Sequence, residues 1–182
     1  MLSTLLFATA AQADGAFALK DIVLGGPTPA WCVAQEAKEE NYSLPTNCTI
    51  FADKKLGDGL PSGWETLAAL PIYSISMDSL DHRVYRVNIN FGGVYQFDEV
   101  KTLLTQKWGP PDVCYPVQDL SCRWGGIVSA NAQLIPGSTA NVCSAQNNPR
   151  DCLELSLTDY PRLVEAGQRR ERAQDAKAKS DL

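Results

Sequence analysis

The clearest pattern in the chain is an alternation of apolar and polar residues on both sides of a short, mainly polar segment. Residues 71–77 alternate, residues 78–82 interrupt the pattern, and residues 85–91 alternate again. A period of two places successive side chains on opposite faces of a strand. The pattern therefore predicts an antiparallel hairpin with one wet face, whose apolar face carries Tyr73, Ile75, Met77, Tyr85, Val87, Ile89 and Phe91.

After this hairpin the apolar residues recur at helical spacing. They are Phe97, Val100, Leu103, Leu104 and Trp108. Asp98 and Glu99 come at the start of this segment and Lys107 near its end, as the helix dipole favours, and residues 109–111 (GPP) cannot continue a helix. We therefore expect an amphipathic helix that packs on the apolar face of the hairpin.

The rest of the chain predicts further elements. Thr28 and Pro29 are typical of a helix start, here of a helix over residues 29–41. Strand patterns follow at 120–128, 132–135 and 152–157, and Asp159 is the expected cap of a last helix that begins at Tyr160.

Together these elements predict the α+β class. We expect an antiparallel sheet of about four to five strands with helices packed on one face, stapled by disulfides. The sequence contains no internal repeat and no long linker, so residues 14–182 are expected to form a single domain. From about residue 160 that domain should continue as a polar C-terminal helix or tail.

Composition and charge exclude some partners. The chain has 182 residues, of which 45% are hydrophobic and 20% charged, enough for one ordinary core. Sixteen basic residues against 21 acidic ones give a net charge of -5. Nucleic acid and anionic lipid both require net or clustered positive charge, so we expect neither as a general partner. No apolar run approaches the length of a transmembrane helix, so no transmembrane segment is expected.

The first residues resemble a leader. Residues 2–11 form an apolar run that ends at Ala11-Gln12-Ala13. An apolar stretch of about ten residues before an A-x-A sequence is typical of a secretory signal and its cleavage site. The run has no Lys or Arg before it, which leaves a start further upstream or a buried structural helix as alternatives. We expect residues 1–13 to be a signal peptide and the protein to be periplasmic or secreted.

The cysteines support export independently. There are six, and an even number in a chain with an export-like leader predicts disulfides. Of the many pairings that six cysteines allow, we favour neighbours, since each pair closes a short loop: Cys32–Cys48, Cys114–Cys122 and Cys143–Cys152. The chain has no C-x-x-C and a single histidine, so we expect no metal site and no cofactor.

The candidates for catalysis are few. His82 is the only histidine, and it lies in the predicted turn with Asp78 and Asp81, where a solvated imidazole or carboxylate lacks the environment that catalysis needs. The chain has no nucleophile elbow, zinc-protease motif, phosphate loop or dinucleotide fingerprint. We therefore expect no catalytic residue and no enzymatic activity.

Two kinds of residue are candidates for partner binding. Arg169, Arg170 and Arg172 form a basic cluster, which is either a solvated helix face or a dock for an acidic partner. Trp64 and Tyr115 lie in loop-like or disulfide-braced segments, where an exposed aromatic side chain anchors a partner at little entropic cost. For Trp64 the alternative is an anchor of its own loop in the core.

The order helix, hairpin, helix ending in W-G-P-P, and Trp-bearing strand resembles a group of small exported bacterial domains. The residues that carry the resemblance are 22–25 (IVLG), 81–87 (DHRVYRV) and 101–111. The group includes outer-membrane assembly lipoproteins of the BamE kind and secreted beta-lactamase inhibitor proteins. The resemblance implies a binding protein rather than an enzyme. It implies no membrane anchor, because this chain lacks the lipobox cysteine of the lipoproteins.

These observations lead to one expected function and two alternatives. We expect an exported, non-catalytic protein-binding module with an unidentified protein partner, for example an inhibitor of a periplasmic or extracellular hydrolase. The first alternative is a structural or assembly factor of the bacterial cell envelope that uses the polar sheet face and the C-terminal helix. The second is a hydrolase whose catalytic residues the sequence does not reveal.

Overall fold

The computed structural model describes residues 17–32, 45–53, 59–67, 69–91, 97–115, 121–136 and 153–180. Of these residues 45% are in strands and 30% in helices. The predicted leader (1–13) and the predicted pair Cys143–Cys152 lie outside the described residues. The helix predicted over 29–41 begins at Ala30 and is described only as far as Cys32.

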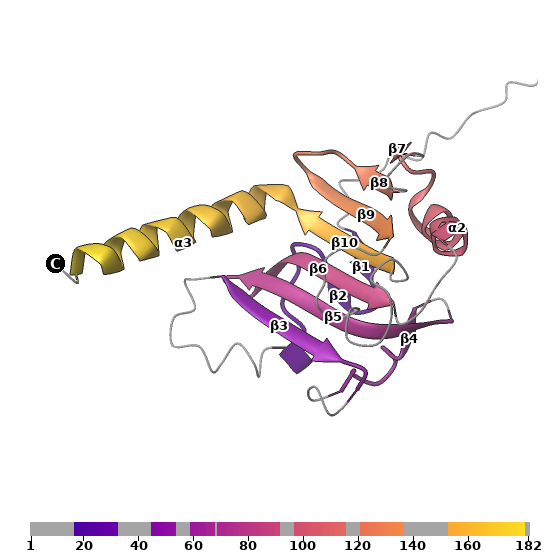
Figure 1. Cartoon of the computed structure of the whole chain (residues 1–182), viewed down its shortest axis with the longest axis horizontal. Coiled ribbons are helices and arrows are strands. Elements are labelled where there is room, and N and C mark those ends of the chain that lie inside the picture. Colours follow the sequence, from indigo (N-terminus) through magenta and orange to yellow (C-terminus); the bar gives the residue numbers. More distant parts are fainter. Residues whose placement is uncertain are drawn as a thin grey trace, which may run out of the picture.

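One large antiparallel sheet organises the molecule (Figure 1). Its central strand, β10 (Leu153–Asp159), comes from the C-terminal part of the chain and lies between β6 and β9. Across the sheet the order is β3 (Thr46–Phe51), β5 (Leu70–Leu80), β6 (Arg83–Phe91), β10, β9 (Ala130–Pro136), β8 (Ser121–Gly125) and β7 (Val113–Tyr115). The short β4 (Thr66–Leu67) also pairs with β5, and β1 (Ala18–Leu19) and β2 (Ile22–Val23) form a separate two-stranded sheet.

The predicted fold class is wrong. The described chain is mostly β, with an eight-stranded sheet instead of four to five strands, and a second, two-stranded sheet. Four of the five additional strands are short: β1, β2 and β4 have two residues each and β7 has three, which is too few for a period to be recognised. The fifth, β3, has six residues and was not predicted. The segment predicted as one strand over 120–128 ends at Gly125, where a turn leads into β9.

The predicted hairpin is confirmed as β5 and β6, which pair antiparallel. Its turn is shorter than predicted, because the ladder continues to the pair Leu80 and Arg83 and leaves only Asp81 and His82 in the turn. Both turn residues have positive φ, 52° and 57°, as a two-residue type I′ turn requires. A register irregularity leaves Tyr85 out of the ladder, and its ring packs with Leu80 instead of joining the main apolar face.

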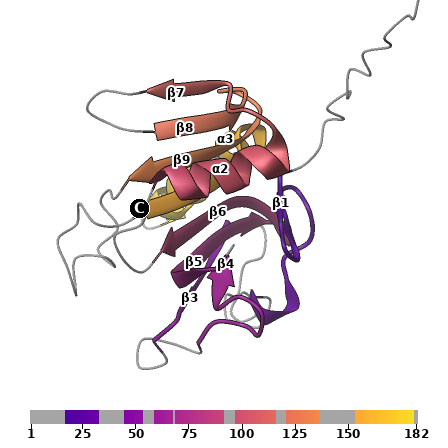
Figure 2. The ribbon, with the colours of Figure 1, turned by 90° about the vertical axis from the view of Figure 1, so that its right-hand side faces the viewer.

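The apolar face of the sheet forms the main core. Buried side chains from six neighbouring strands line it, including Ile50, Ile75, Met77, Val87, Ile89, Leu155, Leu157, Leu134 and Trp124. Three segments cover this face: the N-terminal residues 19–24, the loop that carries Trp64, and helix α2 (Phe97–Trp108). Figure 2 shows α2 lying along the sheet.

The predicted helix over 97–108 is confirmed as α2. Phe97, Val100 and Leu104 are buried, and the helix ends at Gly109, whose φ of 82° is readily adopted by glycine. The Trp124 indole donates a hydrogen bond to the Gly109 carbonyl at 2.9 Å. This bond ties the end of the helix to β8.

Helix α3 (Tyr160–Ser180) does not pack on the apolar face as the predicted layering requires. It starts directly after β10, where the Asp159 carboxylate accepts a hydrogen bond from the Arg162 amide at 3.3 Å, which confirms the predicted cap. Only Ala166 is buried, in a small separate cluster with Leu80 and Tyr85. Beyond this contact the helix projects away from the sheet (Figure 1).

Two of the three predicted disulfides are confirmed. Cys32–Cys48 links the first helical turn to β3 with a Cα–Cα distance of 5.8 Å. Cys114–Cys122 joins directly opposed residues of β7 and β8, 4.1 Å apart at Cα. Among the described residues, no helix is both long and apolar enough to cross a membrane.

Candidate partner-binding surface

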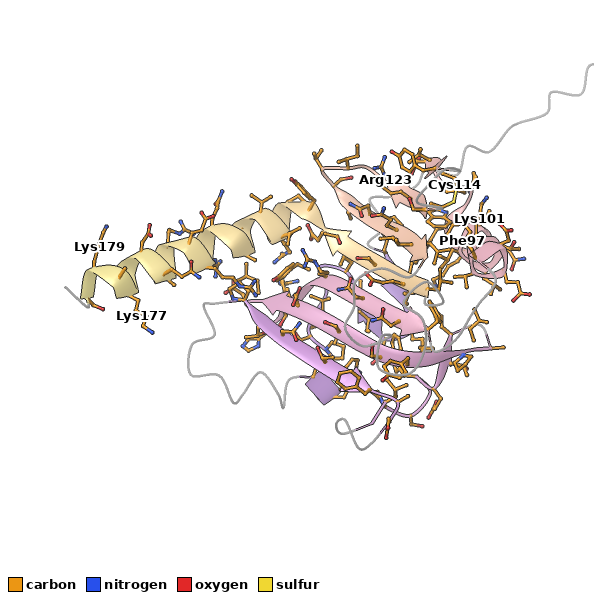
Figure 3. All side chains as sticks on the ribbon, in the orientation of Figure 1. Phe97, Lys101, Cys114, Arg123, Lys177 and Lys179 are labelled. Atoms are coloured by element: carbon orange, nitrogen blue, oxygen red, sulfur yellow. A yellow bond between two sulfur atoms is a disulfide. The ribbon has the colours of Figure 1, made fainter. Side chains whose placement is uncertain are left out.

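Helix α3 carries a concentration of positive charge. It contains six basic and three acidic residues, whereas the whole chain has 16 basic and 21 acidic ones. The remainder of the chain therefore has ten basic and eighteen acidic residues, and the helix differs in sign from the rest of the molecule. Lys177 and Lys179 extend from its far end, remote from the sheet (Figure 3).

The three predicted arginines of α3 differ in their surroundings. Arg169 donates two hydrogen bonds to the Asp81 carboxylate at 2.8 Å and one to Glu165 at 2.7 Å. The hydrogen bonds to Asp81, which have the larger effect, and to Glu165 raise the pKa of the Arg169 guanidinium. Arg169 therefore fastens the helix to the β5–β6 turn. Arg170 and Arg172 are exposed, and neither makes an ion pair within the described residues.

An exposed apolar corner lies at the base of α3. Val128 is 71% exposed and Ile127 63% in the β8–β9 turn, and Val164 is 42% exposed and Tyr160 39% on the first turns of the helix. The turn lies beside the helix start because Ala130, which follows the turn, is the partner of Asp159 at the end of β10. Figure 1 shows the turn and the first turns of α3 side by side. Only two other large apolar side chains among the described residues are exposed, Val23 and Tyr115.

Sequence reasoning missed the β8–β9 part of this corner. Ile127 is predicted in a strand but lies in a turn, between Gly125 and β9. The structure shows why glycine is required at this bend: Gly125 has φ 88°, and a Cβ there would clash with the Ala130 carbonyl. The two glycines at 125–126 mark the turn that exposes the aliphatic residues after them.

Of the two alternatives for Trp64, the exposed contact for a partner is wrong and the core anchor is correct. Its side chain is only 3% exposed and belongs to the main core. The indole Nε1 donates to the Asp21 carboxylate at 2.7 Å, and the Lys20 ammonium lies 4.9 Å above the ring. Trp64 is therefore the core anchor of its loop and is not available to a partner.

Tyr115 has the expected exposure. It is 49% exposed on β7, beside the Cys114–Cys122 disulfide. Among the described residues β7 is the last strand on its side of the sheet. Tyr115 lies at the end of β7 that pairs with Ser121, away from the β8–β9 turn, and so does not join the apolar corner. Its role in partner binding stays a prediction.

The polar face of the sheet is largely satisfied by its own hydrogen bonds. Ser156 donates to Asn88 at 2.8 Å, Asn90 to Ser74 at 3.2 Å, and Asn47 to Asp78 at 2.7 Å. Because these groups bond across the strands, fewer donors and acceptors face outward for a partner. The observed bonds favour the apolar corner over the polar face as the binding surface.

Two ionisable groups near this face have shifted pKa values. Burial raises the pKa of the Glu154 carboxyl, and the neighbouring Arg86 partly opposes the shift. Burial, followed by the negative charge of Asp78, raises the pKa of the Tyr85 hydroxyl.

The two carboxylates predicted in the turn pair with different arginines. Asp78 lies 3.6 Å from Arg86 in an ion pair, whereas Asp81 pairs with Arg169 of α3. His82 is exposed in the turn. Within the described residues no group of three or more His, Cys, Asp or Glu side chains is placed to hold a metal ion.

No protein-family model, curated protein or solved structure matches this chain. The resemblance to small exported bacterial domains therefore stays a prediction that rests on the quoted sequence segments.

Proposed function

We propose that this protein is a non-catalytic protein-binding module that captures an acidic partner protein with its apolar corner and helix α3. The observation that supports the proposal best is the gathering of Ile127, Val128, Tyr160 and Val164 at one corner beside a cation-rich helix. Exposed apolar clusters rimmed by charge are typical of protein interaction sites.

The scaffold behind this surface favours binding. The β8–β9 turn belongs to the main sheet, and α3 is held at its base by Ala166 and by the Arg169–Asp81 ion pair. Residues held in this way lose little conformational freedom when a partner docks. The unpaired cations Arg170 and Arg172 would steer a negatively charged partner toward the corner.

The proposed compartment is the periplasm or the cell exterior. Two disulfides support it, because such bonds persist mainly in oxidising environments. Inhibition of an extracellular or periplasmic hydrolase is one form that this binding would take, with an acidic rim around the active site of the target as the complementary surface.

Capture from an envelope extract tests the proposal. The oxidised protein should retain one stoichiometric partner, and the double variant Ile127→Ser/Val128→Ser should lose most of it while unfolding at the same denaturant concentration. Val23→Ser is the matched control, because Val23 is also an exposed aliphatic side chain, 37% exposed, but lies on β2. Equal capture by both variants would remove the apolar corner from the proposal.

Charge reversal tests the second component. Arg170→Glu/Arg172→Glu should slow association and reduce its dependence on salt, as expected when steering charges are inverted. A partner that binds the reversed protein equally well at low salt would contradict the acidic character that we assign to it.

A further inference from the structure

A second surface feature lies at the opposite side of the molecule from α3. A cavity of about 140 Å³ opens between α2 and the strands β1, β4, β5 and β6. Figures 1 and 2 place α2 on the side of the sheet away from α3. The cavity is therefore separate from the proposed partner-binding surface.

The walls of this cavity are almost entirely apolar. Phe91, Val100 and Leu104 are buried and form its floor, and the half-buried Leu67 and Leu103 stand at its rim. Protein interiors are packed so closely that voids larger than a water molecule are few. A water molecule is held only weakly in such a site, because it needs about two to four polar partners for its hydrogen bonds.

One lining residue is charged. Lys107 lies one helical turn beyond Leu103 on α2, and its exposed side chain makes no ion pair with any other described residue. A lysine at the rim of an apolar cavity keeps its ammonium group in water while its methylene stem continues the apolar wall. The ammonium is thus placed to meet an anionic group that enters with an apolar body.

We propose that this cavity binds a small amphiphile: an aliphatic body of about six to eight carbon atoms that ends in a carboxylate. The size follows from the volume, since an apolar protein cavity of about 150 Å³ admits benzene. The carboxylate is inferred from Lys107. Among the described residues that line the cavity no other side chain is polar, which disfavours sugars and nucleotides, since these need several hydrogen-bonding partners.

Hexanoate and 1-hexanol are the probes, because they share a chain and differ in charge. In NMR titrations of the full-length oxidised protein, hexanoate should saturate with a millimolar or lower Kd and shift the methyl signals of Val100 and Leu104. Lys107→Gln should weaken hexanoate about threefold to fivefold, the loss typical of a partly exposed ion pair, and leave 1-hexanol unchanged.

Lys101→Gln is the matched control. Lys101 is on the same helix but does not line the cavity, so its substitution should leave both affinities unchanged. Leu103→Trp should fill the rim and abolish binding of both probes, and Leu67→Trp serves the same purpose from β4 if the first variant does not fold. The proposal is overturned if hexanoate does not bind, if the filled variants still bind it, or if Lys107→Gln and Lys101→Gln act alike.

Discussion

At the scale of single residues, Asp21 connects the N-terminal segment to the core through hydrogen bonds. Its carboxylate accepts a hydrogen bond from the Trp64 indole at 2.7 Å and another from the Trp31 indole at 3.3 Å. The two rings lie 6.4 Å apart at their centres. One carboxylate thus fixes two aromatic side chains from segments distant in sequence, and this arrangement makes Trp64 structural.

Trp64 and Tyr115 should therefore respond differently to truncation. Trp64→Ala is expected to lower the free energy of unfolding by about 3–5 kcal/mol, the usual loss for a buried tryptophan. Tyr115→Ala should change it by no more than about 0.5 kcal/mol, because the side chain is half exposed. Urea unfolding of both variants measures the difference, and similar midpoints would contradict the burial of Trp64.

Glu154 should give the stability a pH dependence. Because burial raises its pKa in the folded state above the unfolded value of 4.5, the folded protein binds more protons between these two pKa values. The contribution of Glu154 to the unfolding free energy therefore falls as pH rises through this window. Glu154→Gln should remove that fall, so that the variant loses less unfolding free energy between pH 4 and neutral pH than the parent protein does. Parallel pH profiles for the two proteins would argue against the shift.

At the scale of elements, local periodicity predicts those helices and strands whose pattern lies within one segment of the chain. The hairpin alternates over both strands, and α2 has its apolar residues at three- and four-residue spacing, so both follow from the chain itself. Tyr85 departs from the pattern because the β5–β6 ladder has an irregularity there, and the alternation of apolar and polar residues does not predict such an irregularity. The exposed β8–β9 turn was missed because Ile127 and Val128 favour strands by composition, and only the preceding glycines indicate the bend.

Helix α3 divides into a packed base and a solvated remainder. None of the described residues after Ala166 is buried. Deletion of residues 171–182 should therefore change the free energy of unfolding by no more than about 0.5 kcal/mol while reducing the helical circular dichroism signal. Ala166→Glu is the contrasting variant and should cost about 2 kcal/mol or more, because it buries a charge beside Tyr85. A large loss from the deletion would mean that the remainder packs on the domain.

At the scale of the whole molecule, strand order is the part that sequence could not supply. No local pattern indicates that β10 enters between β6 and β9, since this depends on pairings such as Leu155 with Ile89 and Leu134 that are distant in sequence. The two confirmed disulfides were easier to predict, because each connects cysteines that are neighbours along the chain.

The disulfides should stabilise the molecule unequally. They span sequence separations of 16 for Cys32–Cys48 and 8 for Cys114–Cys122. Loop-closure entropy gives about 3 kcal/mol for the first and about 2.5 kcal/mol for the second. The paired alanine variants, compared by urea unfolding, should follow this order. The difference should be widened by the burial of both cysteines in the first pair, since Cys114 is exposed.

The position of β10 in the middle of the sheet also affects when the sheet can form during synthesis. Before residue 153 leaves the ribosome or a translocation pore, β6 and β9 each present an unpaired edge, and the two halves of the sheet have nothing between them. Unpaired edges of this kind invite pairing with other chains. Because β10 pairs with both edges, the sheet can close only after residues 153–159 have been made, and until then both edges stay open to pairing with other chains.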